Sequence, residues 1–263
     1  MIIHQPRRLV IRPGGIGDCI LSLPAIQHLR PSEVWVPSAV VPLIRFAERV
    51  RAIPDTRLDL LGLPGVDPPA ALLDELSQFD SIVSWYGANR PLFQEAVASL
   101  PFRFLTALPP LGATQHAADF FFQQVGGAPP AIPHIECAAH PQGLAVIHPF
   151  SGSASKNWPL DHFREIAAAL PMPVQWCAGP EETLDGATRF DDLHQLASWL
   201  SSASLYIGND SGITHLAAAV GASVIACFAT TNPAVWAPRG PRVQVVHTLQ
   251  EALSFLQRGQ FAL

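Results

Sequence analysis

Residues 205–228 read LYIGNDSGITHLAAAVGASVIACF, and this stretch decides the fold class. An apolar run at 205–207 leads into a loop with two glycines, an alanine-rich segment follows at 214–220, and a second apolar run lies at 223–228. Short apolar runs bounded by turn residues are typical of buried strands, and alanine is the strongest helix former. A helix that joins two such strands predicts a β-α-β unit with parallel strands.

The same alternation continues outward from this stretch in both directions. In the second half we expect further strands at 144–148 and 174–178 and helices at 160–170, 191–202 and 249–257. In the first half we expect strands at 8–12, 34–36, 58–61, 81–85 and 103–105, and helices at 17–29, 39–50, 70–78, 92–100 and 114–125. Strands that alternate with helices along a chain are typical of doubly wound parallel sheets.

A proline-rich segment separates the two halves. Residues 126–143 read GGAPPAIPHIECAAHPQG and have no helical period, which is typical of a linker. We therefore expect a first domain at residues 1–130, a linker at 131–143 and a second domain at 144–263. Open α/β sheets bind ligands at the carboxyl ends of their strands, so functional residues are expected in strand-to-helix loops that face a cleft between the domains.

Composition excludes several classes of protein. Of 263 residues, 49% are apolar and 14% are charged, so most of the chain can form a core, yet no apolar run is long enough to span a membrane. The net charge of −5 argues against a nucleic-acid partner. The four separated cysteines and the absence of an early apolar stretch predict free thiols and a cytoplasmic location.

The first candidate loop reads PGGIGD, between the strand at 8–12 and the next helix. Gly14, Gly15 and Gly17 let the backbone turn sharply and approach a ligand. The spacing is neither the dinucleotide fingerprint nor a Walker loop. Asp18 either accepts a proton from a bound hydroxyl or caps the helix, and the loop alone leaves both interpretations open.

A second candidate loop lies inside the stretch quoted first. The first N–H groups of a helix have no intrahelical partner, so we expect those of residues 211–214, which include Ser211, Gly212 and Thr214, to be unpaired and to face the cleft, where they suit a phosphate. Asp210, next to them, could hold sugar hydroxyls. His215 could donate to a phosphate or be a structural histidine, and we weigh the two equally.

A third candidate loop, residues 148–159, contains the only lysine of the chain. Lys156 stands among serines, including Ser151 and Ser153, whereas the other basic residues are 15 arginines. An ammonium group and hydroxyls on one loop suit a pyrophosphate. A solvated lysine is the ordinary alternative, which the lack of other lysines makes weaker.

A fourth candidate loop, at 177–182, follows the strand at 174–178. Gly179 is followed by Glu181 and Glu182. A carboxylate at the end of a parallel strand commonly accepts hydrogen bonds from ribose hydroxyls. The two glutamates could equally be first-turn acids of a helix.

These loops together resemble glycosyltransferase family 9, the family of the ADP-heptose lipopolysaccharide heptosyltransferases. The matching stretches stand in the family's order along the chain. They are RPGGIGDCILSLPAIQHLR, VIHPFSGSASKNWPLDHFREIAAAL, WCAGPEE and LYIGNDSGITHLAAAVGASVIACFATTNPAVW. The resemblance covers the first loop and nearly all of the second half.

The resemblance implies a GT-B fold, with two Rossmann-like domains facing a cleft, and a metal-independent transfer with inversion from a nucleotide sugar, ADP-heptose above all. Asp18 matches the general base. Lys156, Ser151 and the N–H groups of Ser211 and Gly212 match the diphosphate site, Asp210 the contact to the donor sugar, and Glu182 the contact near the ribose. No cofactor is implied. The expected acceptor is a cell-envelope glycan or a lipopolysaccharide-type glycolipid, with peripheral contact to the inner membrane.

Some features depart from the family or leave alternatives open. Residues 228–231 read FATT where the family usually has FGPT, and the first half is short. A catalytically inactive nucleotide-sugar-binding relative is therefore an alternative, and a sugar-nucleotide epimerase is a weaker one. Arg45 and Arg49, four apart on the helix expected at 39–50, could meet an anionic acceptor or form a solvated face. The tryptophans near the loops are expected to pack in the core; they are Trp158, Trp176, Trp199 and Trp236.

Overall fold

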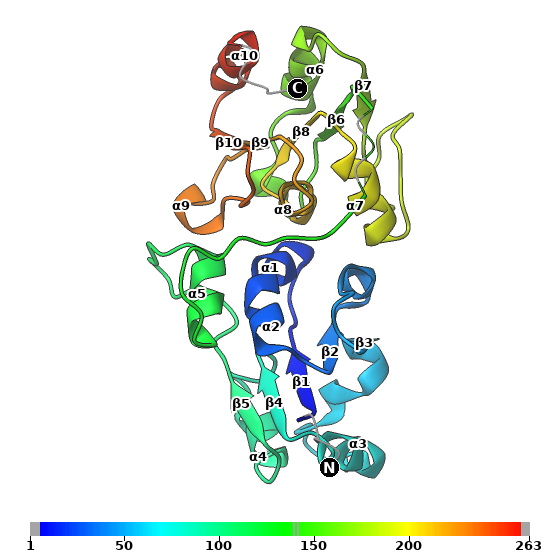
Figure 1. The fold of residues 1–263 in the computed structure, drawn as a ribbon, viewed down its shortest axis with the longest axis vertical. Helices are drawn as coiled ribbons and strands as arrows, with labels where there is room; N and C mark the ends of the chain where they lie inside the picture. The colour runs from blue at the N-terminus through cyan, green and yellow to red at the C-terminus, as the bar shows by residue number, and fades with distance from the viewer. Residues whose placement is uncertain (1–5, 139, 141, 259–263) are drawn as a thin grey trace, which may run out of the picture.

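The computed structural model describes residues 6–138, 140 and 142–258, which form two α/β domains stacked along the long axis (Figure 1). Within these residues the first domain contains one parallel sheet in the order β3-β2-β1-β4-β5. Its strands are β1 (Arg8–Ile11), β2 (Glu33–Val36), β3 (Arg49–Ala52), β4 (Ser81–Ser84) and β5 (Phe102–Phe104). The second domain contains another parallel sheet, in the order β10-β9-β8-β6-β7. Its strands are β6 (Ala145–His148), β7 (Val174–Trp176), β8 (Leu205–Asn209), β9 (Val224–Cys227) and β10 (Val243–Val246).

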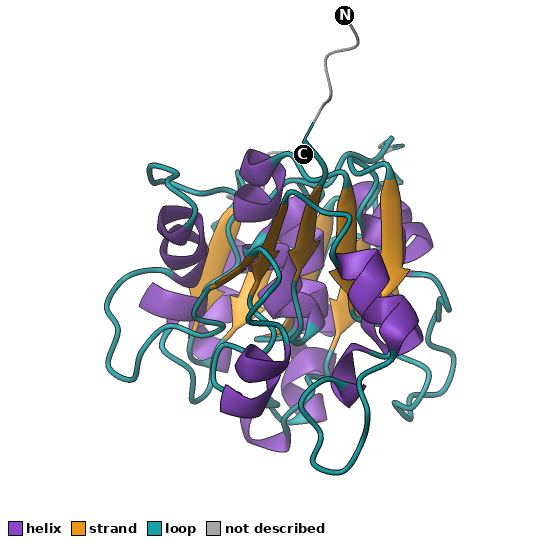
Figure 2. Ribbon diagram, turned by 90° about the horizontal axis from the view of Figure 1, so that it is seen from below, coloured by secondary structure: helices purple, strands orange, loops and turns teal. Residues whose placement is uncertain are grey.

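Helices cover both faces of the sheets, as Figure 2 shows. The first domain has α1 (Ile16–Leu21), α2 (Leu23–Leu29), α3 (Ala70–Leu76), α4 (Pro91–Ala96) and α5 (Ala117–Gln124). The second has α6 (Leu160–Ala169), α7 (Leu193–Ser201), α8 (Gly212–Ala219), α9 (Pro233–Trp236) and α10 (Leu249–Gln257). Short 3-10 helices are η1 (Ser38–Leu43), η2 (Ile53–Thr56), η3 (Leu58–Leu60) and η4 (Ala154–Lys156). The prediction of two doubly wound parallel sheets is confirmed; the domain limits at 130 and 143 stay a prediction.

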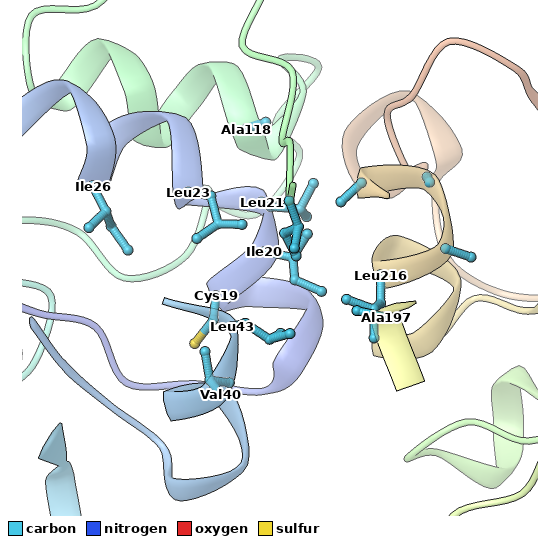
Figure 3. Packing of buried hydrophobic residues seen from close by; sticks show 14 of the residues in the cluster. Cys19, Ile20, Leu21, Leu23, Ile26, Val40, Leu43, Ala118, Ala197 and Leu216 are labelled. Atoms are coloured by element: carbon cyan, nitrogen blue, oxygen red, sulfur yellow. The ribbon is translucent and has the colours of Figure 1, made fainter. Parts of the chain in front are cut away.

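Alternating residues of each strand enter different apolar clusters. In β1, Leu9 and Ile11 pack on the side of α3 and α4, whereas Val10 packs on the side of α1 and α2. This period of two is the reason that helices are required on both faces. The cluster on the Val10 side continues into the second domain without a break. Figure 3 shows Ile20 and Leu21 directed towards Leu216 of α8.

Two expected elements of the first domain are wrong. The helix expected at 39–50 is η1, which contains Pro42, followed by strand β3. Proline lacks the N–H that a longer helix needs, so the chain leaves the helix and pairs with β2 instead. The strand expected at 58–61 is largely η3, because Leu58 and Leu61 are three residues apart and both are buried.

Other differences concern element ends and edges. The helix expected at 17–29 is divided at Ser22 into α1 and α2, and Pro24 lies in the first turn of α2. Strands β3 and β10 and helix α9 were not expected. Both strands lie at sheet edges and keep mostly half-buried or exposed residues, so neither has the continuous apolar run of a central strand.

No helix in the described part of the chain combines the length and the apolar character needed to cross a bilayer.

Candidate functional site

A cavity of about 690 Å³ lies between the two domains, where the loops after β1, β6, β7 and β8 meet. All of the site residues expected from the sequence line it except Gly14, Glu181 and Thr214. The first domain contributes Asp18, and the second contributes Lys156, Glu182, Asp210 and His215. Loops that lie up to about two hundred residues apart in sequence therefore form one site, as expected where strands of open α/β sheets end.

Asp18 lies in the first turn of α1, where its Oδ2 accepts a hydrogen bond from the Gly15 N–H at 3.0 Å. This hydrogen bond gives Asp18 the helix-capping role, one of the two interpretations that the sequence left open. The other oxygen, Oδ1, has no hydrogen-bond partner within the described residues and is free to accept a ligand proton. Gly14 has φ +117°, and a Cβ there would lie 3.0 Å from Asp18 Oδ2. Glycine is therefore required for the loop and the carboxylate to coexist.

Arg12 donates hydrogen bonds to the segment that carries Asp18, and it was not predicted from the sequence. Its side chain is buried, and the guanidinium donates to Ser22 Oγ at 2.8 Å and to the Asp18 carbonyl at 3.2 Å. It also lies 4.6 Å from the centre of the Phe121 ring. Burial lowers the pKa of Arg12, although an arginine stays protonated in a protein. The sequence gives no sign of this burial, because arginine is mostly exposed in folded proteins.

The first turns of α1 and α8 meet face to face beside the cavity. A Cβ at Gly17 would lie 3.0 Å from His215 Cδ2, and one at Gly212 would lie 2.7 Å from Ile16 Cβ. Both glycines are therefore also needed for the close approach of the two domains, in addition to any contact with a ligand.

The N-terminus of α8 differs in one respect from the expectation. Ser211 is the N-cap residue, and its Oγ accepts from the Thr214 N–H at 3.3 Å. The Thr214 hydroxyl donates to the Asn209 carbonyl, and the residue is fully buried. The expectation that the Thr214 N–H is unpaired is therefore wrong, because a serine at the N-cap takes that donor. The N–H groups of Gly212 and Ile213, which have no intrahelical partner, remain beside the cavity.

His215 is buried at the contact between the domains. Burial is the main reason that its pKa is lowered to about 4, although the nearby carboxylates of Asp210 and Asp18 act in the opposite direction. Its Nδ1 has no hydrogen-bond partner among the described residues. At neutral pH the ring is therefore uncharged. It can form a hydrogen bond with a ligand but cannot supply a positive charge.

Lys156 forms the main ionic contact of the cavity. Its Nζ lies 2.9 Å from Asp210 Oδ2, and the Asp210 side chain is 4% exposed. The contact lacks the alignment of a hydrogen bond, so the buried oxygen has a counter-charge but no aligned donor. The Lys156 side chain is 34% exposed and can reach a ligand in the cavity.

Asn209 holds the loop that carries Lys156 and was also missed. The residue is fully buried; its Nδ2 donates to the Pro149 carbonyl at 2.8 Å, and its Oδ1 accepts from the Trp158 N–H at 3.0 Å. Within the loop, Ser151 Oγ donates to the Ser153 carbonyl at 2.9 Å. A side-chain amide satisfied at both ends keeps the loop in place relative to α8.

Glu182 lies half-buried on the loop after β7, next to the end of β6. Its Oε2 accepts from the Gly179 N–H at 2.6 Å and contacts His148 Nε2 at 2.9 Å. Burial acts to raise the pKa of Glu182, but the hydrogen bonds from His148 and Gly179 outweigh it, and the pKa is lowered. Glu182 is therefore an ionised acceptor. His148 also lines the cavity and was not expected there.

The expectations for two arginines and for four tryptophans have different outcomes. Arg45 and Arg49 do not share a helix face: Arg45 contacts His194 Nε2 at 2.9 Å, and Arg49 lies on β3 within 3.7 Å of Glu33. The four tryptophans all pack against apolar clusters, as expected. Trp236 additionally lines the cavity, as does Thr231. Trp236, at the end of α9, can therefore both pack against the apolar cluster and line the cavity.

No group of three or more His, Cys, Asp or Glu side chains among the described residues is arranged to hold a metal ion.

Comparison with known proteins gives one family match and several structural matches. The family model for glycosyltransferase family 9 (heptosyltransferase) matches residues 122–260. No curated protein sequence matches the chain significantly. The solved structures below are under 25% identical to the chain, so they establish the fold.

Three solved structures cover nearly the whole chain. Escherichia coli ADP-heptose LPS heptosyltransferase II superposes with a TM-score of 0.73 at 15% identity, over 96% of this chain and 98% of that one. E. coli heptosyltransferase WaaC with ADP gives 0.66 at 17% identity, over 96% and 99%. The glycosyl transferase family 9 structure from Veillonella parvula gives 0.67 at 17% identity, over 100% and 92%. The two parallel-sheet domains therefore have the GT-B arrangement of these structures.

Proposed function

Because the chain belongs to glycosyltransferase family 9, and is thus a glycosyltransferase, we propose that it transfers heptose from ADP-heptose. In this proposal the transfer inverts the configuration at the anomeric carbon and needs no metal ion. The acceptor is a hydroxyl group of a cell-envelope glycan or a lipopolysaccharide-type glycolipid. Such an acceptor would bring the protein to the cytoplasmic surface of the inner membrane.

One observation carries the proposal: Asp18 and Lys156 line the same cavity from opposite domains. A base on one side and a cation on the other suit a displacement in which the acceptor oxygen attacks from one face and the diphosphate leaves from the other. The negatively charged Asp18 suits the role of the base, and the positively charged Lys156 suits contact with the diphosphate. This arrangement produces inversion, since attack and departure take place on opposite faces of the sugar.

The carboxylate of Asp18 is the proposed general base. Its free Oδ1 takes the proton of the acceptor hydroxyl while that oxygen forms a bond to the anomeric carbon. The Gly15 N–H holds Oδ2 and so limits rotation of the carboxylate. The capping bond and the catalytic role are compatible because they use different oxygens.

The departing diphosphate accumulates negative charge as its bond to the sugar breaks. The Lys156 ammonium and the N–H groups of Gly212 and Ile213 are the proposed partners of this charge. Preorganised donors of this kind stabilise the transition state more than the ground state. These protein groups take the role that a metal ion has in other transferases, so the proposal predicts full activity after treatment with EDTA.

ADP-heptose is the proposed donor for two reasons. The names of two structural matches refer to ADP-heptose or ADP, and the cavity contains groups suited to each part of such a molecule. Ionised Glu182 would accept from ribose hydroxyls, and Ser151 and Ser153 lie near the proposed diphosphate site. Asp210 would accept from a hydroxyl of the donor sugar.

Product analysis tests the proposal. Purified protein is incubated with ADP-heptose, with and without an acceptor glycan extracted from cell envelopes, and the products are identified by mass spectrometry. A heptose transferred only when acceptor is present supports the proposal. Conversion of the donor without acceptor would indicate an epimerase, and binding without conversion would indicate an inactive nucleotide-sugar-binding relative.

The variant Asp18→Asn tests the proposed role of Asp18 as the general base. An asparagine Oδ1 can still accept the Gly15 N–H, so the cap and the fold are retained while the base is lost. We expect transfer to fall by at least about 10²-fold, with donor affinity nearly unchanged. Asp74→Asn, an exposed change on α3, is the matched control. Full transfer by Asp18→Asn would show that Asp18 is not the base.

A further inference from the structure

His148 and Glu182 lie on neighbouring strands of the second sheet. His148 is the last residue of β6, and Glu182 lies on the loop that follows β7. The strands are paired in parallel, with Ile147 opposite Trp176, so both residues come to the carboxyl edge of the sheet. Their proximity depends on this pairing and could not be read from the sequence.

Among the described residues, the Glu182 side chain accepts two hydrogen bonds, and both involve one carboxylate oxygen. Oε2 receives the Gly179 N–H at 2.6 Å and His148 Nε2 at 2.9 Å. Within the described residues, Oε1 has no hydrogen-bond partner, and the Glu182 side chain is 28% exposed. The carboxylate is thus held at one oxygen and open at the other.

The direction of the His148 bond follows from the state of Glu182. An ionised carboxylate only accepts hydrogen bonds, so Nε2 must be the donor. The His148 side chain is 3% exposed, which restricts its rotation. A buried donor of fixed direction is suited to orienting a carboxylate, as in pairs that position metal ligands or catalytic histidines.

The free Oε1 needs a ligand that donates. A carboxylate oxygen at the end of a parallel strand suits hydroxyl donors, and a ribose carries two adjacent ones. Phosphate groups are excluded as partners of Oε1 because both would be negatively charged. The ribose diol of a nucleotide sugar therefore suits Glu182, whereas its phosphates do not.

We propose that His148 is a positioning residue that sets nucleotide affinity by orienting Glu182 towards the ribose hydroxyls of the donor. This inference rests on the proposed function, because it requires a ribonucleotide ligand. His148 acts on the ribose only through Glu182, so its removal should weaken binding only of ligands that have these hydroxyls.

Calorimetric titration with two ligands tests this. The probes are ADP and 2′,3′-dideoxy-ADP, which lacks both ribose hydroxyls. We expect His148→Leu to weaken ADP binding by about 10-fold, the usual effect of losing a hydrogen bond to a charged group. For 2′,3′-dideoxy-ADP we expect no difference between the variant and the unmodified protein.

Three further variants complete the design. His148→Gln keeps an N–H donor near the position of Nε2 and should recover most of the ADP affinity. Glu182→Gln should weaken ADP binding, and His148→Leu combined with it should cause no additional loss, because the two residues act in sequence. His28→Leu, an exposed change on α2, is the control for loss of a histidine.

Each outcome separates the inference from the proposed function. Equal losses for ADP and 2′,3′-dideoxy-ADP, or additive losses in the double variant, would overturn the inference, because His148 would then contact the ligand directly or act only on stability. Unchanged ADP affinity in His148→Leu would also overturn it. Failure of the unmodified protein to bind ADP would overturn the proposed donor and the inference together.

Discussion

Gly212 and Ile16 meet across the domain boundary so closely that a Cβ on Gly212 would lie 2.7 Å from Ile16 Cβ and 3.0 Å from the Gly17 N atom. Carbon atoms in proteins do not approach to such distances without displacement. The first turns of α1 and α8 are consequently in contact through backbone atoms and the Ile16 side chain. The same two turns carry Asp18 and the proposed diphosphate donors, so the spacing of the proposed catalytic groups depends on this contact.

Gly212→Ala should therefore destabilise the protein and disturb the site. Overpacking of a close contact costs about 1–3 kcal/mol, and we expect a lower Tm together with reduced transfer. Gly152→Ala is the control in the thermal unfolding experiment, because its added Cβ would meet no atom within 4 Å. Equal Tm values for the two variants would contradict the importance of the contact.

Another connection between the domains is the ion pair of Asp119 and Arg239. Arg239 Nη1 and Nη2 donate to Asp119 Oδ1 and Oδ2 at 2.6 and 2.7 Å, and the Asp119 side chain is 13% exposed. Asp119→Asn leaves the mostly buried arginine without a counter-charge, which should cost about 3 kcal/mol of unfolding free energy. Urea denaturation at neutral pH measures this loss.

The pair should also make stability depend on acid. Burial acts to raise the pKa of Asp119, but the hydrogen bonds from Arg239 and the Ala131 N–H outweigh it, so the pKa is lowered. The resulting stability is present above the unfolded-state pKa of about 4 and is lost as the pH falls through the lowered folded-state value. Asp119→Asn should flatten this part of the stability profile. The exposed pair of Asp161 and Arg164 is the control, and Asp161→Asn should change stability by less than about 1 kcal/mol.

Lys156→Ala should weaken nucleotide binding more than the loss of one contact would. The substitution removes the cation and also leaves the buried Asp210 carboxylate uncompensated beside the proposed diphosphate site. We expect ADP affinity to fall by about 10- to 100-fold in calorimetry, whereas adenosine, which has no phosphate, should bind unchanged.

The double variant Lys156→Ala with Asp210→Asn checks the cause of that effect. If repulsion from Asp210 contributes, the double variant should bind ADP more tightly than Lys156→Ala alone. A further loss in the double variant would show instead that Asp210 contacts the nucleotide favourably. Equal loss of adenosine and ADP binding would mean that Lys156 does not act on the phosphates.

His215 should make the protein less stable as the solution becomes mildly acidic. Burial lowers its folded-state pKa to about 4, below the unfolded value of about 6.5. The unfolded chain therefore binds the proton first, and stability falls as the pH decreases from 6.5 towards 4 by up to about 3 kcal/mol. His215→Gln should reduce this slope in denaturation curves. An unchanged slope would show that folding does not lower the pKa of His215.

Local periodicity predicted most of the fold. Central strands such as β6 and β8 are buried on both faces and appear in the sequence as continuous apolar runs. The edge strands β3 and β10 were not predicted, because Arg49, Arg51 and Gln244 interrupt their apolar pattern. Their place is decided by pairing with a neighbouring strand, which the sequence does not display.

The residues that line the cavity were predicted where their place depends on loop position, and not where it depends on contacts between loops. The four glycine- or serine-containing loops were located because each follows a recognisable strand. Arg12, Asn209 and His148 were missed, since a buried polar residue has no sequence signature that distinguishes it from an exposed one. The Thr214 N–H was expected to be free because the capping bond of Ser211 was overlooked.

By itself, the sequence determined most of the β-α units, the parallel character of the sheets and the residue types in each loop, because these depend on local periodicity and turn chemistry. Only the tertiary structure decided which groups meet: Asp119 contacts Arg239 across a sequence separation of 120, and His148 contacts Glu182 across 34. Such contacts follow from how whole sheets and helices pack. The spacing of the proposed base, cation and ribose contact therefore depends on how the two domains assemble, while the chemistry of each group is set by its residue type in the sequence.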